Sequence, residues 1–450
     1  MKDVASVNSQ ATELMNKIEE RSAVAGVIGL GYVGLPLAVA MAKGGFRTVG
    51  FDIDPSKPTL LKSSRSYIGA VSDEKLHGLI TSGRLDATTD FSLLAQCDVI
   101  AVCVPTPLTR NRDPDLSYVE NTARTIAKYL RRGQLVVLES TTWPGTTEEI
   151  LKPILEASGF QSGRDFFVGF SPEREDPGNL AFTTTSIPKV VAGDGADASL
   201  LMSALYAAVV DKIVIVSSPA TAEAVKITEN IFRAVNIALV NELKVIYDAM
   251  GIDVWEVIEA AKTKPFGYMP FYPGPGLGGH CIPIDPFYLT WKSREHGIAT
   301  RFIELAGEIN LSMPKFVIGK LEEALDRQQA VSLGSAHVLL IGLAYKKNVS
   351  DIRESPGFKL IELLEIRGTR VDYLDPHIPE VPPTREHAAM TGRRSVDSCL
   401  TTYTPYDAVI ICTDHDALDY QIVFATARLI VDTRNVFGRL GLSGKHIVKA

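Results

Sequence analysis

The chain has 450 residues, of which 46% are hydrophobic and 22% are charged, and its formal net charge is -7. Because single hydrophobic cores stop growing well below this length, we expect a folded globular protein of two or three domains. The small net charge, without a block dense in Lys and Arg, argues against a nucleic-acid footprint or a membrane-surface patch, and no apolar run predicts a membrane span.

The N-terminal segment and the cysteines indicate where the protein works. Residues 1–22 carry charges throughout and lack the apolar run of a signal peptide, so we expect a cytoplasmic protein with an extra N-terminal helix over residues 8–20. The cysteines are too few and too scattered for a disulfide framework or a structural zinc site. They are Cys97, Cys103, Cys281, Cys399 and Cys412. We expect no metal, and we expect Cys97, Cys103 and Cys412 to be inert packing residues in or beside apolar strands.

Short apolar segments alternate with helical segments along the first part of the chain. The strand-like ranges are 23–28, 47–51, 99–104, 135–138, 166–170 and 189–191. Residues 221–261 then read as one long helical region, and a loop dense in Gly and Pro covers 265–286. After helices that end near 325, a second alternating series has strand-like ranges at 336–341, 371–374, 408–412 and 429–431.

This pattern predicts an α/β fold with two Rossmann-like, doubly wound parallel sheets joined by a central helical domain. The expected domain bounds are 1–218, with the extra helix in 1–22, then 219–318 for the helical domain and 319–450 for the second sheet.

The first chemical motif follows the first predicted strand and precedes a helix. It reads Gly29-Leu30-Gly31-Tyr32-Val33-Gly34. Its glycines permit a tight turn, a close approach of the backbone to a pyrophosphate, and close packing of helix on strand. Asp52 ends the next strand, where a carboxylate can accept hydrogen bonds from an adenosine ribose. This acid favours NAD over NADP, although Lys57 leaves NADP open.

Three loops follow strands of the first sheet, at the edge where α/β sheets bind ligands. The first contains Pro105 and Thr106, the second runs from Glu139 through Thr141 to Gly145, and the third contains Glu173 and Arg174. We expect them to handle a nicotinamide or its substrate, the alternative being turns fixed only by proline.

The strongest single motif surrounds one cysteine. Its sequence is Gly274-Pro275-Gly276-Leu277-Gly278-Gly279-His280-Cys281-Ile282-Pro283-Ile284-Asp285. Because glycine has no side chain, the glycines leave Cys281 accessible to a ligand. A thiol among backbone amides ionises more readily than a buried one. Lys226 and Asn230 lie four residues apart and share a helix face. Spacing alone fits a solvated face, but their position just past the first domain favours a cleft.

Taken together, these motifs resemble the UDP-glucose/GDP-mannose dehydrogenase family from Val24 to Val436. The shared motifs include the glycine hexapeptide, the Glu139 and Glu173 loops, Lys226 with Asn230, and the cysteine loop, followed by Gly342-Leu343-Ala344-Tyr345-Lys346 and Asp351-Ile352-Arg353-Glu354-Ser355-Pro356.

The resemblance implies NAD in the first domain, a UDP-sugar in the last, and a helical middle that pairs subunits as a homodimer or a higher oligomer. It implies that Cys281 is the nucleophile, with the remaining catalytic roles on Lys226, Asn230, Asp285, Thr141 and Glu173. The implied cofactor contacts are Gly29, Gly31, Tyr32, Val33, Gly34, Asp52, Pro105, Thr106, Thr141 and Arg353. The implied substrate contacts are Glu173, Arg174, Lys226, Asn230, Tyr272, Gly276, Gly279, Tyr345, Lys346 and Arg434.

One departure from the family pattern indicates the substrate. Members that oxidise UDP-glucose usually have a lysine just before the loop aspartate, whereas Ile284 precedes Asp285 here. The chain therefore resembles the branch that oxidises UDP-N-acetylhexosamines, with UDP-N-acetylglucosamine the first expectation and UDP-N-acetylmannosamine the second. The implied reaction is a four-electron oxidation of the C6 alcohol to a carboxylate through a Cys281 thiohemiacetal and thioester, in the biosynthesis of a surface polysaccharide.

The alternatives are a UDP-glucose 6-dehydrogenase, a two-electron hydroxyacid dehydrogenase and a redox-sensing module that only binds the dinucleotide. The last two leave the cysteine loop unexplained.

Overall fold

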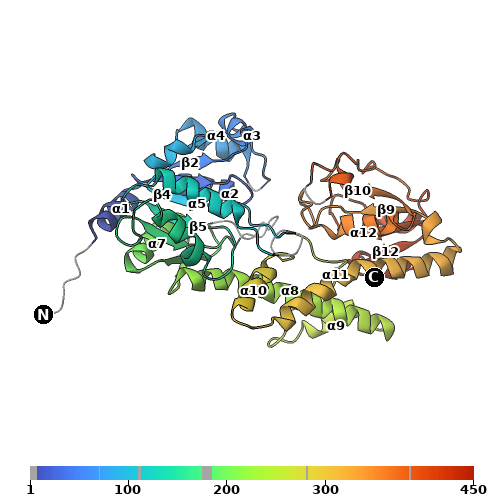
Figure 1. Cartoon of the computed structure of the whole chain (residues 1–450). Coiled ribbons are helices and arrows are strands. Elements are labelled where there is room, and N and C mark those ends of the chain that lie inside the picture. Colours follow the sequence, from blue (N-terminus) through green and yellow to red (C-terminus); the bar gives the residue numbers. More distant parts are fainter. Residues whose placement is uncertain (1–7, 70, 110–112, 175–184, 280–281, 385–386) are drawn as a thin grey trace. The chain divides into compact units, whose positions relative to one another are not determined.

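The computed structural model describes residues 8–69, 71–109, 113–174, 185–279, 282–384 and 387–450. The chain forms two compact units. The N-terminal unit comprises residues 1–229 and 287–298, and the C-terminal unit comprises 230–286 and 299–450. Each unit holds one sheet, blue to green in the first and orange to red in the second (Figure 1). The central helical segment contributes residues to both units.

The sheet of the N-terminal unit has the strand order β3-β2-β1-β4-β5-β6-β7-β8. Its strands are β1 Val24–Ile28, β2 Arg47–Phe51, β3 Leu85–Thr88, β4 Val99–Val102, β5 Leu135–Leu138, β6 Phe167–Phe170, β7 Lys189–Gly193 and β8 Ile213–Ile215. All neighbours pair in parallel except β6 and β7, which are antiparallel. The order reverses between β1 and β4, and a doubly wound sheet binds its ligand at that point.

Helices cover both faces of this sheet because its strands carry apolar side chains on both faces. The α-helices that precede the central segment are α1 Ser9–Glu19, α2 Gly34–Lys43, α3 Ser56–Lys62, α4 Asp73–Thr81, α5 Ser117–Tyr129, α6 Lys152–Glu156 and α7 Ala196–Ala207. The same part of the chain has the 3-10 helix η1 Phe91–Gln96 and the π-helix η2 Thr147–Leu151. Helices α1, α2 and α7 share one core with Val27, Ala101 and Val137 of the strands. The extra helix expected over 8–20 is confirmed, and Leu14 and Ile18 fix it to this core.

The central segment consists of α8 Pro219–Ala249, α9 Val254–Ala261, α10 Asp285–Glu295 and α11 Arg301–Gln329. The expectation of one helical region over 221–261 is wrong in detail, because the chain leaves the helix between α8 and α9. Gly251 has a φ of +72° there, a conformation that ends a right-handed helix. Asp253 then accepts a hydrogen bond from Trp255 N and starts α9.

The second sheet has the order β10-β9-β11-β12-β13 and is parallel throughout. Its strands are β9 His337–Ile341, β10 Arg370–Leu374, β11 Ala408–Ile411, β12 Ile430–Asp432 and β13 Ile447–Lys449. One core joins α11 and α12, Pro356–Glu365, to one face of the sheet, and another joins α13, Tyr420–Thr426, and α14, Val436–Arg439, to the other face. The predicted fold class, two doubly wound α/β domains with helices between them in sequence, is confirmed.

Sequence reasoning missed the short strands β3, β8 and β13. Each has three or four residues, β8 exposes two of its three residues and those of β13 are only half-buried, so no long apolar run marks them. Among the helices of the described residues, none combines the length and the apolar character that crossing a membrane requires.

Candidate active site

The turn after β1 has the geometry of a dinucleotide-binding loop. Gly29 has a φ of +89°, and a Cβ added there would lie 2.7 Å from the Cys103 carbonyl oxygen. A Cβ on Gly34 would lie 1.8 Å from Gly29 O, so this glycine lets α2 pack closely against the turn. A Cβ on Gly31 meets nothing within 4 Å. The backbone at Gly31 is therefore bare and open, as a bound pyrophosphate requires.

Asp52 lies at the end of β2, beside this turn. One oxygen of its carboxylate accepts hydrogen bonds from Leu30 N and from Lys57 Nζ, both at 2.8 Å. The other oxygen accepts from Asp54 N at 3.0 Å. The acid is thus fixed against the glycine turn, where a ribose would lie. Lys57 neutralises part of its charge in this structure.

The Pro105–Thr106 loop is held by α10, which follows the cysteine loop in the chain. Thr106 is buried, and its carbonyl oxygen accepts a hydrogen bond from the Tyr288 hydroxyl at 2.5 Å. Tyr288 also lies against Trp143, with ring centroids 6.3 Å apart. Two of the three expected loops therefore share contacts with one helix inside the N-terminal unit.

The loop that carries Thr141 begins at a buried ion pair. Lys189 Nζ donates to the Glu139 carboxylate at 2.5 Å, and the Tyr206 hydroxyl donates to its other oxygen. Burial raises the pKa of Glu139, against the opposing effect of Lys189 and Tyr206. Lys189 Nζ also donates to Pro172 O at 3.2 Å, so the same cation holds the start of the Glu173 loop.

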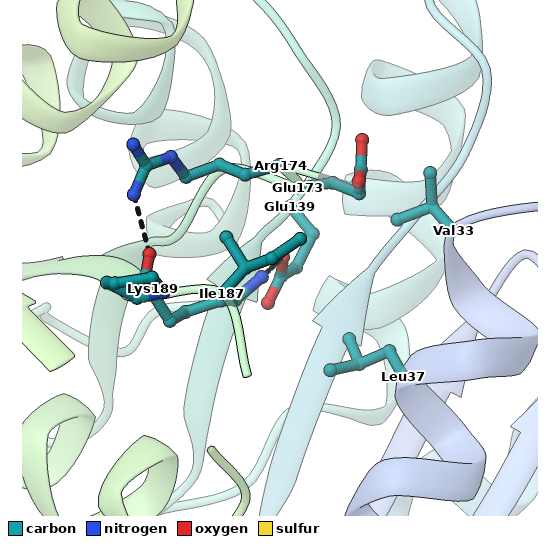
Figure 2. Close-up of a pocket in the computed structure, with 8 residues that line it drawn as sticks. Val33, Leu37, Glu139, Glu173, Arg174, Ile187 and Lys189 are labelled. Atoms are coloured by element: carbon teal, nitrogen blue, oxygen red, sulfur yellow. Dashed lines mark hydrogen bonds and ion pairs between the residues drawn. The ribbon is translucent and has the colours of Figure 1, made fainter. Parts of the chain in front are cut away.

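Glu173 and Arg174 line a pocket at this edge of the sheet (Figure 2). The other lining residues are Val33, Leu37, Glu139, Ile187, Pro188 and Lys189. Lys226 Nζ, from α8, donates to Glu173 O at 2.5 Å and lies 3.6 Å from the Glu173 carboxylate. Arg174 donates to Pro188 O at 2.6 Å and pairs with Glu229 of α8 at 2.5 Å. The N-terminal unit therefore brings Lys226, Glu173 and Val33 of the predicted site to one region.

In the C-terminal unit, Asn230 and Asp285 are in direct contact. The Asn230 amide nitrogen donates to the Asp285 carboxylate at 2.5 Å, and Asp285 is 1% exposed. Asp285 is the first residue of α10, in the helical turn where a negative charge is stabilised. Lys226 lies one turn before Asn230 on α8, as the sequence spacing predicts.

The glycine loop packs against predicted substrate contacts from the second sheet. A Cβ on Gly278 would lie 2.6 Å from the Tyr345 Cβ, and one on Gly274 would lie 2.6 Å from the Arg434 guanidinium. Gly279 N donates to Arg353 O at 2.9 Å. The glycines thus give the chain room to run directly over these residues, which explains why larger side chains are absent from this stretch.

Other predicted residues have different surroundings. Tyr272 is exposed, donates to the Glu259 carboxylate at 2.6 Å and stacks on Trp255, with ring centroids 5.8 Å apart. Arg353 is held by the Asp351 carboxylate, with a closest distance of 2.6 Å. Tyr345 and Lys346 belong to the turn after β9.

The predicted nucleophile Cys281 lies outside the described residues, together with His280. Cys97, Cys103 and Cys412 are buried, and burial raises the pKa of each, to about 12 for Cys97 and about 11 for Cys412. These three are packing thiols, as expected.

Several residues at these loops were not singled out from the sequence. Lys189 reads as part of an apolar strand, and Tyr206 and Glu229 read as ordinary helix positions. Only Glu229 carries a signal, because it is adjacent to Asn230.

Models of three domains of one family match this chain. They describe the UDP-glucose/GDP-mannose dehydrogenase family: its NAD binding domain at residues 23–210, its central domain at 220–312 and its UDP binding domain at 339–439. The chain belongs to this family. It is therefore an NAD-dependent dehydrogenase of nucleotide sugars, and the bare turn at Gly31 beside Asp52 fits that cofactor.

Relatives in the family extend over nearly the whole chain. A UDP-N-acetyl-D-mannosamine dehydrogenase from Pyrococcus horikoshii is 35% identical over 91% of this chain and 95% of its own length. A UDP-N-acetyl-D-glucosamine 6-dehydrogenase from Pseudomonas aeruginosa is 36% identical over 86% of this chain and 90% of its own. Among solved structures, the UDP-D-ManNAc dehydrogenase from Pyrococcus horikoshii has a TM-score of 0.82 at 34% identity, covering 92% of this chain and 95% of that one.

Proposed function

We propose that this dehydrogenase oxidises the C6 alcohol of a UDP-N-acetylhexosamine to a carboxylate, with UDP-N-acetylglucosamine first and UDP-N-acetylmannosamine second. The observation that carries the proposal is the buried Asp285 carboxylate, hydrogen-bonded to Asn230 and four residues after Cys281. Ile284, in place of a lysine, and the named substrates of the relatives support an N-acetylhexosamine over glucose.

The first step removes a proton and a hydride from the C6 alcohol. Asp285, through a water, or Lys226 takes the hydroxyl proton. NAD, when bound, accepts the hydride, and two NAD molecules are needed because conversion of an alcohol to an acid removes four electrons. Thr106, Thr141 and the Gly29–Gly34 turn hold the cofactor in this scheme.

The second step is covalent. The Cys281 thiolate adds to the aldehyde carbon and gives a thiohemiacetal, whose oxyanion receives hydrogen bonds from the Lys226 ammonium and the Asn230 amide. Loss of the remaining C6 hydride leaves a thioester on Cys281. Water, activated by Asp285 or positioned by Glu173 and Thr141, then hydrolyses the thioester and releases the carboxylate.

The remaining proposed residues contact either the cofactor or the UDP-sugar. Asp52 and Arg353 are proposed cofactor contacts, and the bounds proposed for the cofactor domain are 1–218. Residues 319–450 are proposed to hold the UDP-sugar. The proposed substrate contacts are Arg174, Tyr272, Gly276, Gly279, Tyr345, Lys346 and Arg434.

Residues 219–318 are proposed to pair two copies of the chain. Phe232, Leu239 and Ile246 follow each other at seven-residue spacing on α8 and are exposed, as are Phe302 and Leu305 on α11. Seven residues are close to two helical turns, so the three α8 side chains form one apolar stripe. Light scattering of the wild type and of Leu239→Glu tests this pairing, which predicts a dimer and a smaller species respectively.

The thiol chemistry also supports a proposal for the cellular compartment of the protein. Thiolate catalysis requires Cys281 to stay reduced, and the described cysteines are free thiols, so we propose the cytoplasm. The uronic acid product would supply a surface polysaccharide.

A panel of UDP-sugars tests the substrate assignment. UDP-N-acetylglucosamine, UDP-N-acetylmannosamine, UDP-glucose and a simple hydroxyacid are each given with NAD, while NADH and product are quantified. The proposal predicts the highest kcat/KM with an N-acetylhexosamine and two NADH per carboxylate. Preference for UDP-glucose would refute the substrate assignment, and one NADH per product would favour a two-electron dehydrogenase.

A further inference from the structure

Glu223 is a buried carboxylate that the proposed chemistry does not use. It lies on α8 one turn before Lys226 and is fully buried. One carboxylate oxygen accepts a hydrogen bond from Gly145 N at 2.5 Å. The other accepts from Thr147 N at 2.9 Å and from the Thr147 hydroxyl at 2.6 Å. All three donors belong to Gly145 and Thr147, at the end of the loop that carries Thr141, where the short π-helix η2, Thr147–Leu151, begins.

The same loop is anchored at its other end and along its side. Glu139, where the loop begins, is held by Lys189 and Tyr206. Trp143 packs on Trp291 of α10, with ring centroids 4.6 Å apart. Thr141 therefore lies on a short stretch of chain between two carboxylates, one of which belongs to the loop and the other to α8.

The energetics indicate that Glu223 is more than a packing residue. Burial raises its pKa to about 7, and the hydrogen bonds from Thr147 and Gly145 act against this rise, while the neighbouring charge of Glu148 adds to it. A buried carboxylate is unfavourable unless its oxygens are satisfied. Here both oxygens are satisfied by one loop, so the position of the loop is determined by the position of α8.

We propose that Glu223 is a positioning residue. It holds the 140–147 loop, and with it Thr141, at a fixed position relative to Lys226, which lies on the same helix as Glu223. The inference rests on the proposed role of Thr141 and Lys226 in the reaction. Glu223 itself contacts neither substrate nor cofactor in this scheme; it acts through the loop.

Substitution of Glu223 tests whether it positions the loop. Glu223→Gln keeps one carbonyl acceptor, and Glu223→Ala keeps none. Because a misplacement of about 1 Å commonly costs on the order of 10²-fold in rate, we expect kcat to fall by about 10²-fold in Glu223→Ala and by less in Glu223→Gln. KM for the UDP-sugar should change by less than about twofold, since none of its proposed contacts lies on residues 140–147, whereas KM for NAD should rise because Thr141 is a proposed cofactor contact.

Thr147 offers a milder pair of variants if Glu223→Ala fails to fold. Thr147→Val removes one of the three donors and Thr147→Ser keeps it. We expect a kcat loss of about tenfold in the valine variant and restoration in the serine variant. Glu148→Gln is the matched control, because Glu148 is an exposed neighbour whose charge reaches Glu223 without a hydrogen bond to it. Its kcat should match the wild type.

Amide hydrogen exchange separates this inference from the proposed function. In Glu223→Gln and Thr147→Val, exchange at residues 145–147 should accelerate while strands β4 and β5 stay protected, whatever the substrate. Unchanged exchange and unchanged kcat in both variants would overturn the positioning role. Faster exchange in an enzyme that oxidises no UDP-N-acetylhexosamine would instead leave Glu223 in place and refute the proposed function.

Discussion

In each of the two sheets, the strand that comes first in the chain is followed by a glycine turn of the same geometry, but the two turns have different roles. After β1, Gly29 N donates to Phe51 O at 2.8 Å, and after β9, Gly342 N donates to Leu374 O at 2.8 Å. Both glycines have a positive φ, near +89° and +86°, and each is followed by a leucine whose amide donates to an aspartate at the end of the next strand.

The aspartates differ in what else they bind. Asp52 meets Lys57, whose side chain is partly exposed. Asp375 is fully buried and accepts from Leu343 N, Ala344 N, His377 N and Ile378 N, and from His415. Burial opposes its ionisation, yet the hydrogen bonds from His415 and the amides outweigh burial and lower its pKa. Asp52 is therefore paired with a partly exposed lysine beside the glycine turn, where a ribose would lie, whereas Asp375 holds a loop through four amides and a histidine.

The helix that follows differs too. Helix α2 starts at Gly34, five residues after Gly29, whereas α12 starts at Pro356, well beyond Gly342. The longer connection carries Tyr345, Lys346 and Arg353. The comparison teaches that the same strand-and-glycine geometry presents a helix terminus in one unit and a side-chain-bearing loop in the other.

Asp375→Ala should give the largest effect on this comparison. It leaves buried amides and His415 without an acceptor, and each buried donor left unsatisfied costs about 1–3 kcal/mol. Urea unfolding should report this loss, and the part of it that depends on the charge should shrink as the pH falls from the ordinary aspartate pKa through the lowered pKa of Asp375, because the wild type then loses the same charge. Asp372→Ala, three residues earlier and more exposed, is the control. Equal stability of the two variants would break the comparison.

Asp52→Ala should instead affect the cofactor. A hydrogen bond to a charged group contributes about 1.5–3 kcal/mol, so KM for NAD should rise about tenfold or more while KM for the UDP-sugar stays constant. Steady-state kinetics with each substrate varied in turn provide the measurement. A loss of global stability comparable to that of Asp375→Ala would show that the two acids play the same role.

The glycines give a matched pair of smaller changes. A Cβ on Gly342 would lie 2.2 Å from Thr413 O, and its φ is positive, so Gly342→Ala should destabilise the protein by about 1–3 kcal/mol. Gly31→Ala should leave the melting temperature unchanged, because its Cβ meets open space, and should raise KM for NAD. Thermal melts and NAD titrations of both variants test the contrast. The reverse pattern would contradict it.

Lys57→Met should give the smallest effect. Partly exposed ion pairs contribute about 0.2–1 kcal/mol, so KM for NAD should change by less than about fivefold. Loss of the cation beside Asp52 should lower any activity with NADP further, because the 2′-phosphate then meets an uncompensated carboxylate. A gain of NADP activity would show that Lys57 does not screen Asp52.

The sequence predicts local features of this molecule well and distant contacts poorly. The glycine turn, Asp52 and the one-turn spacing of Lys226 and Asn230 are set within one strand, turn or helix, and the periodicity that predicts those elements also places the residues. The break between α8 and α9 is a local feature that was missed, although Gly251 ends the apolar pattern there.

Contacts across long separations needed the structure. Glu139 meets Lys189 fifty residues later, and Gly274 lies against Arg434. Nothing in the spacing of these residues indicates the partner, because strand order and loop path bring them together. The family resemblance identified Arg434 and Tyr345 as substrate contacts, but it did not indicate that they pack against the glycine loop.

The central claim is that one thiol carries the second oxidation. The most direct measurement counts NADH formed per UDP-N-acetylglucosamine consumed in the wild type and in Cys281→Ala. The account predicts two NADH and a carboxylate in the wild type, with carboxylate formation almost abolished in the variant. Two NADH per sugar at a near-normal rate in Cys281→Ala would contradict it.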